Sequence, residues 1–190
     1  MATTLVILFA VVLVLLAVGG YGISMYNSLV SLQRRCDQSF QNIDVLEKQR
    51  NDELTKLIDA VSGFMDHEED VLTELTRARE MAEQAVTPGE HAEADQMVRN
   101  AMMSLNARAE DYPELRSSEN MMQLQNRISE IENQIADRRE FYNEAATRNN
   151  TRVQQFPYLL MANQFGFDER ELFEATAEEK ADVDVSKAFA

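Results

Sequence analysis

The two histidines and the single cysteine are the side chains of this sequence best suited to bind a metal or attack a substrate. His67-Glu68 begins like the zinc-protease motif HExxH, but Val71 stands where the second histidine belongs, so the motif is incomplete. The run Asp66–Asp70 (DHEED) could instead collect a divalent cation. Because carboxylates spread around the turns of a helix do not converge on one ion, we interpret this run as a solvated helix face.

His91 falls in the first turn of a predicted helix, and we interpret it as a surface residue. One cysteine excludes a disulfide or a CxxC metal pair within the chain. We expect Cys36 to be a small residue on a buried helix face, with an intermolecular disulfide as the alternative. The sequence contains no glycine-rich phosphate loop and no GxSxG nucleophile elbow. It therefore predicts no catalytic residue, no metal ligand and no cofactor.

The elements that carry these residues begin with an unbroken apolar run, and the first charged side chain of the chain is Arg34. As a helix, residues 1–23 extend roughly 35 Å, enough to cross a hydrocarbon core of ~30 Å. We therefore predict a transmembrane anchor over residues 1–24. A cleaved secretory signal is the alternative, but the first four residues lack the basic side chains of a signal. The predicted membrane-anchor residues are Leu5, Val6, Ile7, Leu8, Phe9, Val11, Val12, Leu13, Val14, Leu15, Leu16 and Val18.

The positive-inside tendency predicts the orientation of this anchor. Arg34, Arg35 and Lys48 follow the apolar run, whereas no basic side chain precedes it. We expect a single-pass protein of the cell membrane, with its N-terminus outside and its C-terminal domain in the cytoplasm. Tyr21 and Tyr26 stand where an interfacial aromatic belt would lie.

The remaining composition is that of a helical, strongly acidic protein. The chain has no Trp, three Pro and six Gly, which favours helices. Its net charge of −15 argues against nucleic acid as a partner and against a chain that lies flat on anionic lipid. Only four of its 18 basic residues are lysines. Acid excess with few lysines leads to the hypothesis of a halophilic protein from a high-salt cytoplasm.

Behind the apolar run, apolar residues recur at alternating spacings of three and four, the pattern of one helical stripe. Three charged residues, Glu47, Arg50 and Glu68, interrupt this stripe. We predict one long amphipathic, coiled-coil-like helix over residues 25–86, or two nearly collinear helices that flex near Asn51-Asp52.

Turn and cap residues predict three further helices. A capping box at Thr87–Glu90 (TPGE) opens the first of them, and Tyr112-Pro113 stops it. The next begins after Ser117-Ser118. A short final helix is framed by Pro157 and Gly166.

Helices with one apolar face must pack on each other or on a partner. The predicted fold is therefore all-α, with a single N-terminal transmembrane helix followed by an elongated antiparallel three- to four-helix bundle. The expected domains are an anchor over residues 1–24, a helical bundle over 25–174 and an acidic disordered tail over 175–190.

The segment before the tail is unusually rich in large apolar residues for a short helix. Closing one end of the bundle is the simpler interpretation. Contact with the membrane, with sister subunits or with a partner is the alternative. The candidate interaction residues are Phe156, Tyr158, Leu159, Leu160, Met161, Phe165, Phe167 and Phe173.

A colinear series of motifs across residues 20–175 resembles the LemA family. The series includes Tyr26-Asn27, Lys48-x-Arg50-x-Asp52, Gly63-Phe64-x-x-His67-Glu68, Tyr112-Pro113-Glu114-Leu115, Arg138-Arg139 and Phe141-Tyr142-Asn143-Glu144-Ala145. The chain departs from the family pattern at Phe40, where a Trp is usual, and at Thr55, where a Pro is usual; the second change suggests a straighter first helix. The resemblance implies a membrane helix that carries an elongated helical bundle. It implies no reaction and no active-site residues.

These features predict a membrane-anchored, non-enzymatic helical scaffold that contacts lipid through its N-terminal helix and associates with copies of itself. An adaptor or regulator of a neighbouring membrane enzyme or transporter is the alternative, with other membrane proteins as partners. An enzyme ranks third, because no catalytic constellation is present in the sequence.

Overall fold

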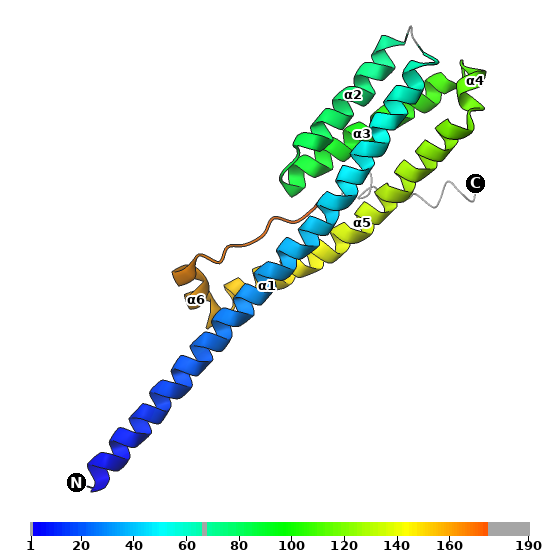
Figure 1. Cartoon of the computed structure of the whole chain (residues 1–190). Coiled ribbons are helices and arrows are strands. Elements are labelled where there is room, and N and C mark those ends of the chain that lie inside the picture. Colours follow the sequence, from blue (N-terminus) through cyan, green and yellow to red (C-terminus); the bar gives the residue numbers. More distant parts are fainter. Residues whose placement is uncertain (1, 66–67, 175–190) are drawn as a thin grey trace, which may run out of the picture. The chain divides into compact units, whose positions relative to one another are not determined.

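The computed structural model describes residues 2–65 and 68–174, and these residues are almost entirely helical. No strand occurs among them, which confirms the all-α prediction. The predicted tail at 175–190 lies outside the described residues, as do Asp66 and His67 of the acidic run. The helices are α1 (Ala2–Ser62), α2 (Glu69–Gln84), α3 (Pro88–Ala109), α4 (Pro113–Arg116), α5 (Glu119–Gln154) and α6 (Tyr158–Phe165) (Figure 1).

The chain divides into two compact units. We call residues 2–41 with 141–170 the N-terminal unit, and residues 42–140 with 171–174 the core unit. Helices α1 and α5 contribute to both units, whereas α2, α3 and α4 belong to the core unit and α6 to the N-terminal unit.

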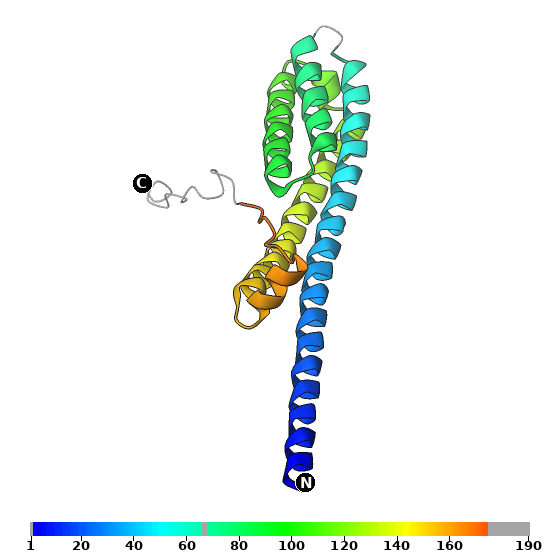
Figure 2. The same cartoon turned by 90° about the vertical axis from the view of Figure 1, so that its left-hand side faces the viewer.

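In the core unit, helices pack around one apolar cluster. Within this unit α2 folds back beside α1 and runs antiparallel to it (Figure 2). Apolar residues from every helix of the unit meet in its centre, as the packing of one-sided helices requires. Among its most deeply buried members are Leu54, Leu57, Leu75, Val98, Leu105, Leu115 and Ile128.

The prediction of one long helix over residues 25–86 is wrong. Helix α1 passes Asn51-Asp52 without a break and ends at Ser62, and α2 begins only at Glu69. Gly63, a weak helix former, follows the last residue of α1, and Met65 is buried in the core. Because the chain reverses here, the apolar stripe of α2 joins the apolar cluster that also buries the stripe of α1, instead of facing solvent.

The capping box at the start of α3 is confirmed. The Thr87 hydroxyl accepts a hydrogen bond from the Glu90 amide at 3.2 Å, and the Glu90 carboxylate accepts one from the Thr87 amide at 2.9 Å. These two bonds lower the number of unpaired amides in the first turn of the helix. The Glu90 pKa is lowered because its carboxylate accepts hydrogen bonds from the Thr87 and Val86 amides.

Thr87→Ala is expected to lower the free energy of unfolding by about 1 kcal/mol, because it removes the side-chain half of this cap. Urea denaturation followed by circular dichroism measures the change. Thr55→Ala, at an exposed threonine inside α1, is the matched control. Equal stability of Thr87→Ala and the parent chain would contradict a role for the cap.

In the N-terminal unit, α6 and the last turns of α5 pack beside α1. The Phe40 and Tyr142 rings meet edge-on at 5.4 Å, and Leu29, Val153 and Ala162 form a small apolar cluster. As predicted, Gly166 ends α6 in the left-handed conformation, at a φ of 70°.

Polar bonds hold the chain that follows α6. Asn150 receives a hydrogen bond from the Arg170 amide at 2.7 Å and donates one to the Arg170 carbonyl at 2.8 Å. The Arg170 guanidinium donates to Asp37 on α1 at 2.8 Å. These bonds join α1, α5 and the segment after α6 within one unit.

Candidate functional site

The core unit buries a connected chain of five ionisable side chains, which we call the ion network: His91, Glu47, Arg139, Asp95 and Arg50. His91 Nδ1 lies 2.5 Å from Glu47 Oε2, and Arg139 Nη2 donates to Glu47 Oε1 at 3.0 Å. Arg139 also bonds Asp95 Oδ2, while Arg50 Nη1 donates to Asp95 Oδ1 at 2.7 Å. Both oxygens of each carboxylate therefore have a cationic or histidine partner.

Three helices supply these side chains at helical spacing. Glu47 and Arg50 are three residues apart on α1, and His91 and Asp95 are four apart on α3, so each pair lies on one helix face. Arg139 comes from α5. Each ion pair except that of His91 with Glu47 uses a guanidinium, whose fork geometry suits carboxylates. The network therefore fixes the register of α1, α3 and α5 within the core unit.

The network is shielded from water. Arg50 is only 2% exposed, and the Phe173 ring covers Arg139, whose guanidinium carbon lies 4.5 Å from the ring centre. Arg50 Nε and Arg139 Nε are buried without a hydrogen-bond partner among the described residues. Buried charges of this kind are tolerated because they are paired, and removing one partner leaves an uncompensated charge.

The charges of Arg50 and Asp95 in the ion network affect the pKa of Glu132 on α5. Burial raises the pKa of the Glu132 carboxyl, while Arg50 opposes this shift and Asp95 adds to it. The folded protein therefore binds this proton more tightly than the unfolded chain does. It follows that the Glu132 contribution to stability falls as pH rises above the ordinary pKa of 4.5.

Glu132→Gln is expected to raise the free energy of unfolding at neutral pH and to reduce its fall between acidic and neutral pH. The amide is neutral throughout, so the variant avoids burying a carboxylate. Urea denaturation at several pH values tests this, with the exposed Glu130→Gln on the same helix as the matched control. A loss of stability at neutral pH would contradict the prediction and indicate that the ionised carboxylate is needed.

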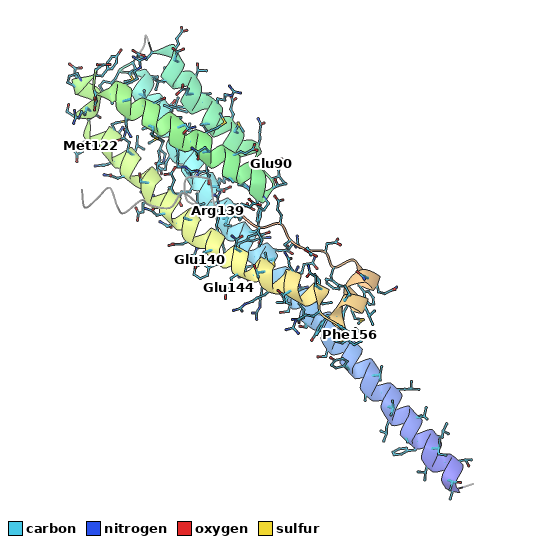
Figure 3. All side chains as sticks on the ribbon, turned by 180° about the vertical axis from the view of Figure 1, so that it is seen from behind. Glu90, Met122, Arg139, Glu140, Glu144 and Phe156 are labelled. Atoms are coloured by element: carbon cyan, nitrogen blue, oxygen red, sulfur yellow. The ribbon has the colours of Figure 1, made fainter. Side chains whose placement is uncertain are left out.

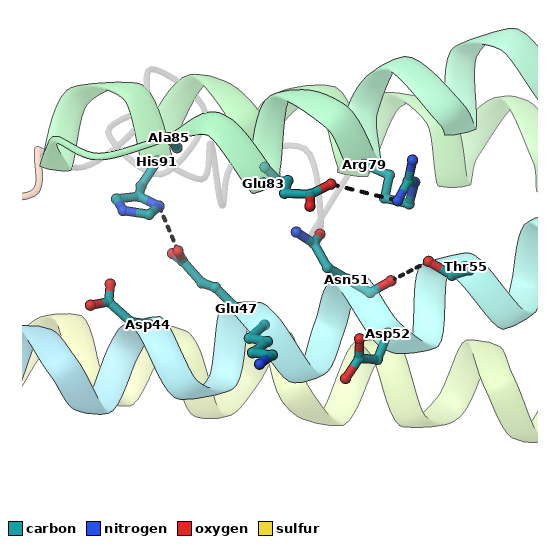
Figure 4. A pocket seen from close by; sticks show the side chains of 11 residues that line it. Asp44, Glu47, Asn51, Asp52, Thr55, Arg79, Glu83, Ala85 and His91 are labelled. Carbon is teal, nitrogen blue, oxygen red and sulfur yellow. Dashed lines mark hydrogen bonds and ion pairs between the residues drawn. The ribbon is translucent and has the colours of Figure 1, made fainter.

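Beside the network lies a cavity of 380 Å³ lined by Asp44, Glu47, Asn51 and His91 among others (Figure 4). The ligand atoms of Asp44, Glu47 and His91 lie within 4.8 Å of one another, a spacing that could hold a cation. However, Glu47 already accepts from His91 and Arg139, so a cation would displace these partners. Desolvation also raises the pKa of Asp44, against the opposing effect of His91. The arrangement therefore favours an ion-paired structural site.

The interpretation of His91 as a surface residue is wrong, since its side chain is only 5% exposed. The apolar stripe of α3 extends back from Ala94 by three residues to His91, and that spacing was the available signal. The Glu47 and Arg50 interruptions of the α1 stripe were a second signal, because they are opposite charges one helical turn apart.

Cys36 is buried as predicted, at 1% exposure. Burial raises the pKa of its thiol, and the charge of Arg170 opposes this shift. A buried thiol of raised pKa is a poor nucleophile, because the thiolate is the reactive form.

A second candidate site is the apolar start of α1. Among the described residues, α1 is the helix long and apolar enough to cross a bilayer, and its apolar window is not buried within the chain. Each of the twelve predicted anchor residues is exposed; Leu16, for example, is 67% exposed. Tyr21 and Tyr26 are also exposed, and the Tyr26 ring contacts the rings of Phe165 and Phe167, at 5.1 and 5.6 Å between centroids.

The eight candidate interaction residues do not form one surface. Phe156, Leu159, Leu160 and Phe165 are exposed, and Tyr158, Met161 and Phe167 pack against the small cluster of the N-terminal unit. Phe173 belongs to the core unit, where it is buried against Arg139. Phe173 therefore adds no exposed apolar surface to the described chain, and its ring shields the ion network.

Comparison with known proteins gives a family and three relatives. The model of the LemA family matches residues 39–186. Protein LemA of Metamycoplasma hominis is 26% identical over 162 residues, which cover 85% of this chain and 74% of that protein. Magnetosome proteins MamQ 1 and MamQ 2 of Paramagnetospirillum magneticum are each 35% identical over 75 residues, or 40% of this chain and 28% of each relative.

Proposed function

The chain belongs to the LemA family, and from this premise we propose that it is a membrane-anchored, non-enzymatic helical scaffold that associates with copies of itself at the cell membrane. The N-terminal helix enters the bilayer with its N-terminus outside, and the core unit extends into the cytoplasm.

The exposed apolar start of α1 is the observation that carries this proposal. Leu5, Leu15 and Leu16 are each about two-thirds exposed, at 66, 65 and 67%. An apolar surface of this extent marks a contact with lipid or protein. A single helix suits lipid, because it satisfies its own backbone hydrogen bonds there. Arg34 and Arg35 follow the apolar stretch on the expected cytoplasmic side.

A structural role for the core unit agrees with its buried charges. Their carboxylate oxygens are paired with His91, Arg50 and Arg139, and these pairs connect α1, α3 and α5 to one another. This supports a scaffold more than an acid–base catalyst, which needs a group free to exchange its proton with a substrate.

The test is the mass of the full-length protein in nanodiscs, measured beside a chain that starts at Met25. A discrete multiple of 21.7 kDa for the full-length protein, and a monomer for the shortened chain, are expected. A full-length monomer would contradict self-association. If crosslinking in membranes then recovered a second membrane protein, the adaptor or regulator function would replace the scaffold.

A further inference from the structure

Helix α6 and the turn before it expose several large apolar side chains within a few residues. Phe156 is 79% exposed, Leu160 is 62%, Phe165 is 56% and Leu159 is 40%. Figure 3 shows Phe156 at the turn between α5 and α6. Single exposed apolar residues are ordinary on a protein surface, but a cluster of this kind marks a contact.

Contacts between α6 and α1 place this cluster next to the end of the apolar stretch of α1. Phe165 contacts Tyr26, and Ala162 packs against Leu29. Met161 lies beside Gly22, where an added Cβ would be 3.9 Å from the methionine methyl carbon. The exposed side chains of α6 therefore continue the apolar surface of α1 at the position where that stretch gives way to polar residues.

The charge of the N-terminal unit also suits a membrane surface. The unit holds five arginines against four carboxylates, so its side-chain charge is +1 and the rest of the chain carries −16 of the overall −15. The arginines are Arg34, Arg35, Arg148, Arg152 and Arg170, and the carboxylates are Asp37, Glu144, Asp168 and Glu169. The exclusion of anionic lipid that follows from the whole-chain charge therefore does not hold for this unit.

Arg152 and Tyr158 add a feature of interfacial helices. The Arg152 guanidinium carbon lies 4.6 Å from the centre of the Tyr158 ring, at the start of α6. Interfacial helices combine basic residues with aromatic residues and leucine, and the aromatic rings lie at headgroup level. The side chains around α6 have this composition.

We propose that α6 is a second membrane contact, in which Phe156, Leu159, Leu160 and Phe165 insert into the interfacial layer of the bilayer that α1 crosses. The occupant of this surface is lipid. This inference rests on the proposed membrane anchoring, and it adds a shallow contact to the transmembrane one. Helix α6 would then fix the depth at which α1 sits in the bilayer.

The absence of tryptophan from the sequence allows a direct test with single-tryptophan variants of the full-length chain. Leu160→Trp reports on α6, Leu13→Trp on the middle of the apolar stretch, and Met103→Trp is the control at an exposed position of the core unit. Each variant is reconstituted into phosphatidylcholine vesicles whose acyl chains are brominated near the headgroup or near the bilayer centre. Circular dichroism checks that each variant keeps the helical content of the parent chain.

We expect the Leu160→Trp emission to shift to the blue and to lose most intensity with bromine near the headgroup. Leu13→Trp should lose most with bromine near the bilayer centre, and Met103→Trp should be unaffected. Quenching of Leu13→Trp without quenching of Leu160→Trp would overturn the contact of α6 and leave the anchor standing. Lack of quenching in both would overturn both proposals.

A blue-shifted Leu160→Trp that bromine does not quench would also overturn the inference. If that shift disappears when the protein is diluted among excess vesicles, a second copy of the chain covers α6 instead of lipid.

Discussion

Asp95→Ala is expected to lower the free energy of unfolding by about 3–5 kcal/mol, because it breaks a buried ion pair by removing one partner. Asp95 receives Arg50 on one carboxylate oxygen and Arg139 on the other. Arg50 is 2% exposed and cannot reach water without local unfolding. The variant therefore leaves the buried Arg50 guanidinium without its ion-pair partner.

Urea denaturation of the full-length protein in mild detergent, followed by circular dichroism, measures this loss. Glu93→Ala is the matched control, since it removes an exposed carboxylate two residues away on α3 and should change stability by less than about 0.5 kcal/mol. Replacing Arg50 with Met in the Asp95→Ala background should restore part of the loss, because the orphaned charge is gone. An Asp95→Ala chain as stable as Glu93→Ala would show that the network contributes nothing to folding.

Leu13→Arg combined with Leu16→Arg is expected to release the protein from membranes. An arginine near the centre of a spanning helix costs about 2.5–3.5 kcal/mol on the insertion scale, so the pair removes about 5–7 kcal/mol of the driving force for insertion. Both side chains are exposed within the chain, so the substitutions disturb no internal packing. Retention of the protein in alkali-washed membranes measures the effect.

Val86→Arg combined with Met103→Arg makes the same charge change at exposed positions of the core unit and should leave the membrane fraction unchanged. Retention of the Leu13→Arg, Leu16→Arg variant would contradict the anchor. The mass of the intact mature protein separates the anchor from a cleaved signal, because cleavage would remove the apolar residues altogether.

Features that depend on local chemistry could be predicted from the sequence. The capping box at Thr87, the end of α6 at Gly166 and the burial of Cys36 each follow from nearby residues, and each is confirmed. The apolar stretch from Leu5 also became one continuous helix as expected. In these cases the physical cause lies within a few positions along the chain.

Features that depend on distant partners could not be predicted in this way. The stripe after residue 62 has the period of a continuing helix, but the chain reverses there, so that the apolar residues of α2 join the cluster shared by the helices of the core unit. Glu47 and Arg50 were recognised as interruptions, but their partners His91 and Arg139 come from other helices. Periodicity identifies the buried face of a helix and leaves open what that face meets.

The single thiol of the chain offers a way to measure the two units separately. Cys36 is the only cysteine, lies in the N-terminal unit and is 1% exposed, so an alkylating reagent reaches it only when that unit opens. When reclosing is faster than alkylation, the labelling rate gives the free energy of that opening. The core unit contains no cysteine, so its unfolding adds to the rate only when it opens the N-terminal unit as well. Cys36 is thus a built-in probe of local opening in the N-terminal unit. Comparing its alkylation rate with and without lipid, in the chain without any substitution, measures whether lipid makes this unit open less often.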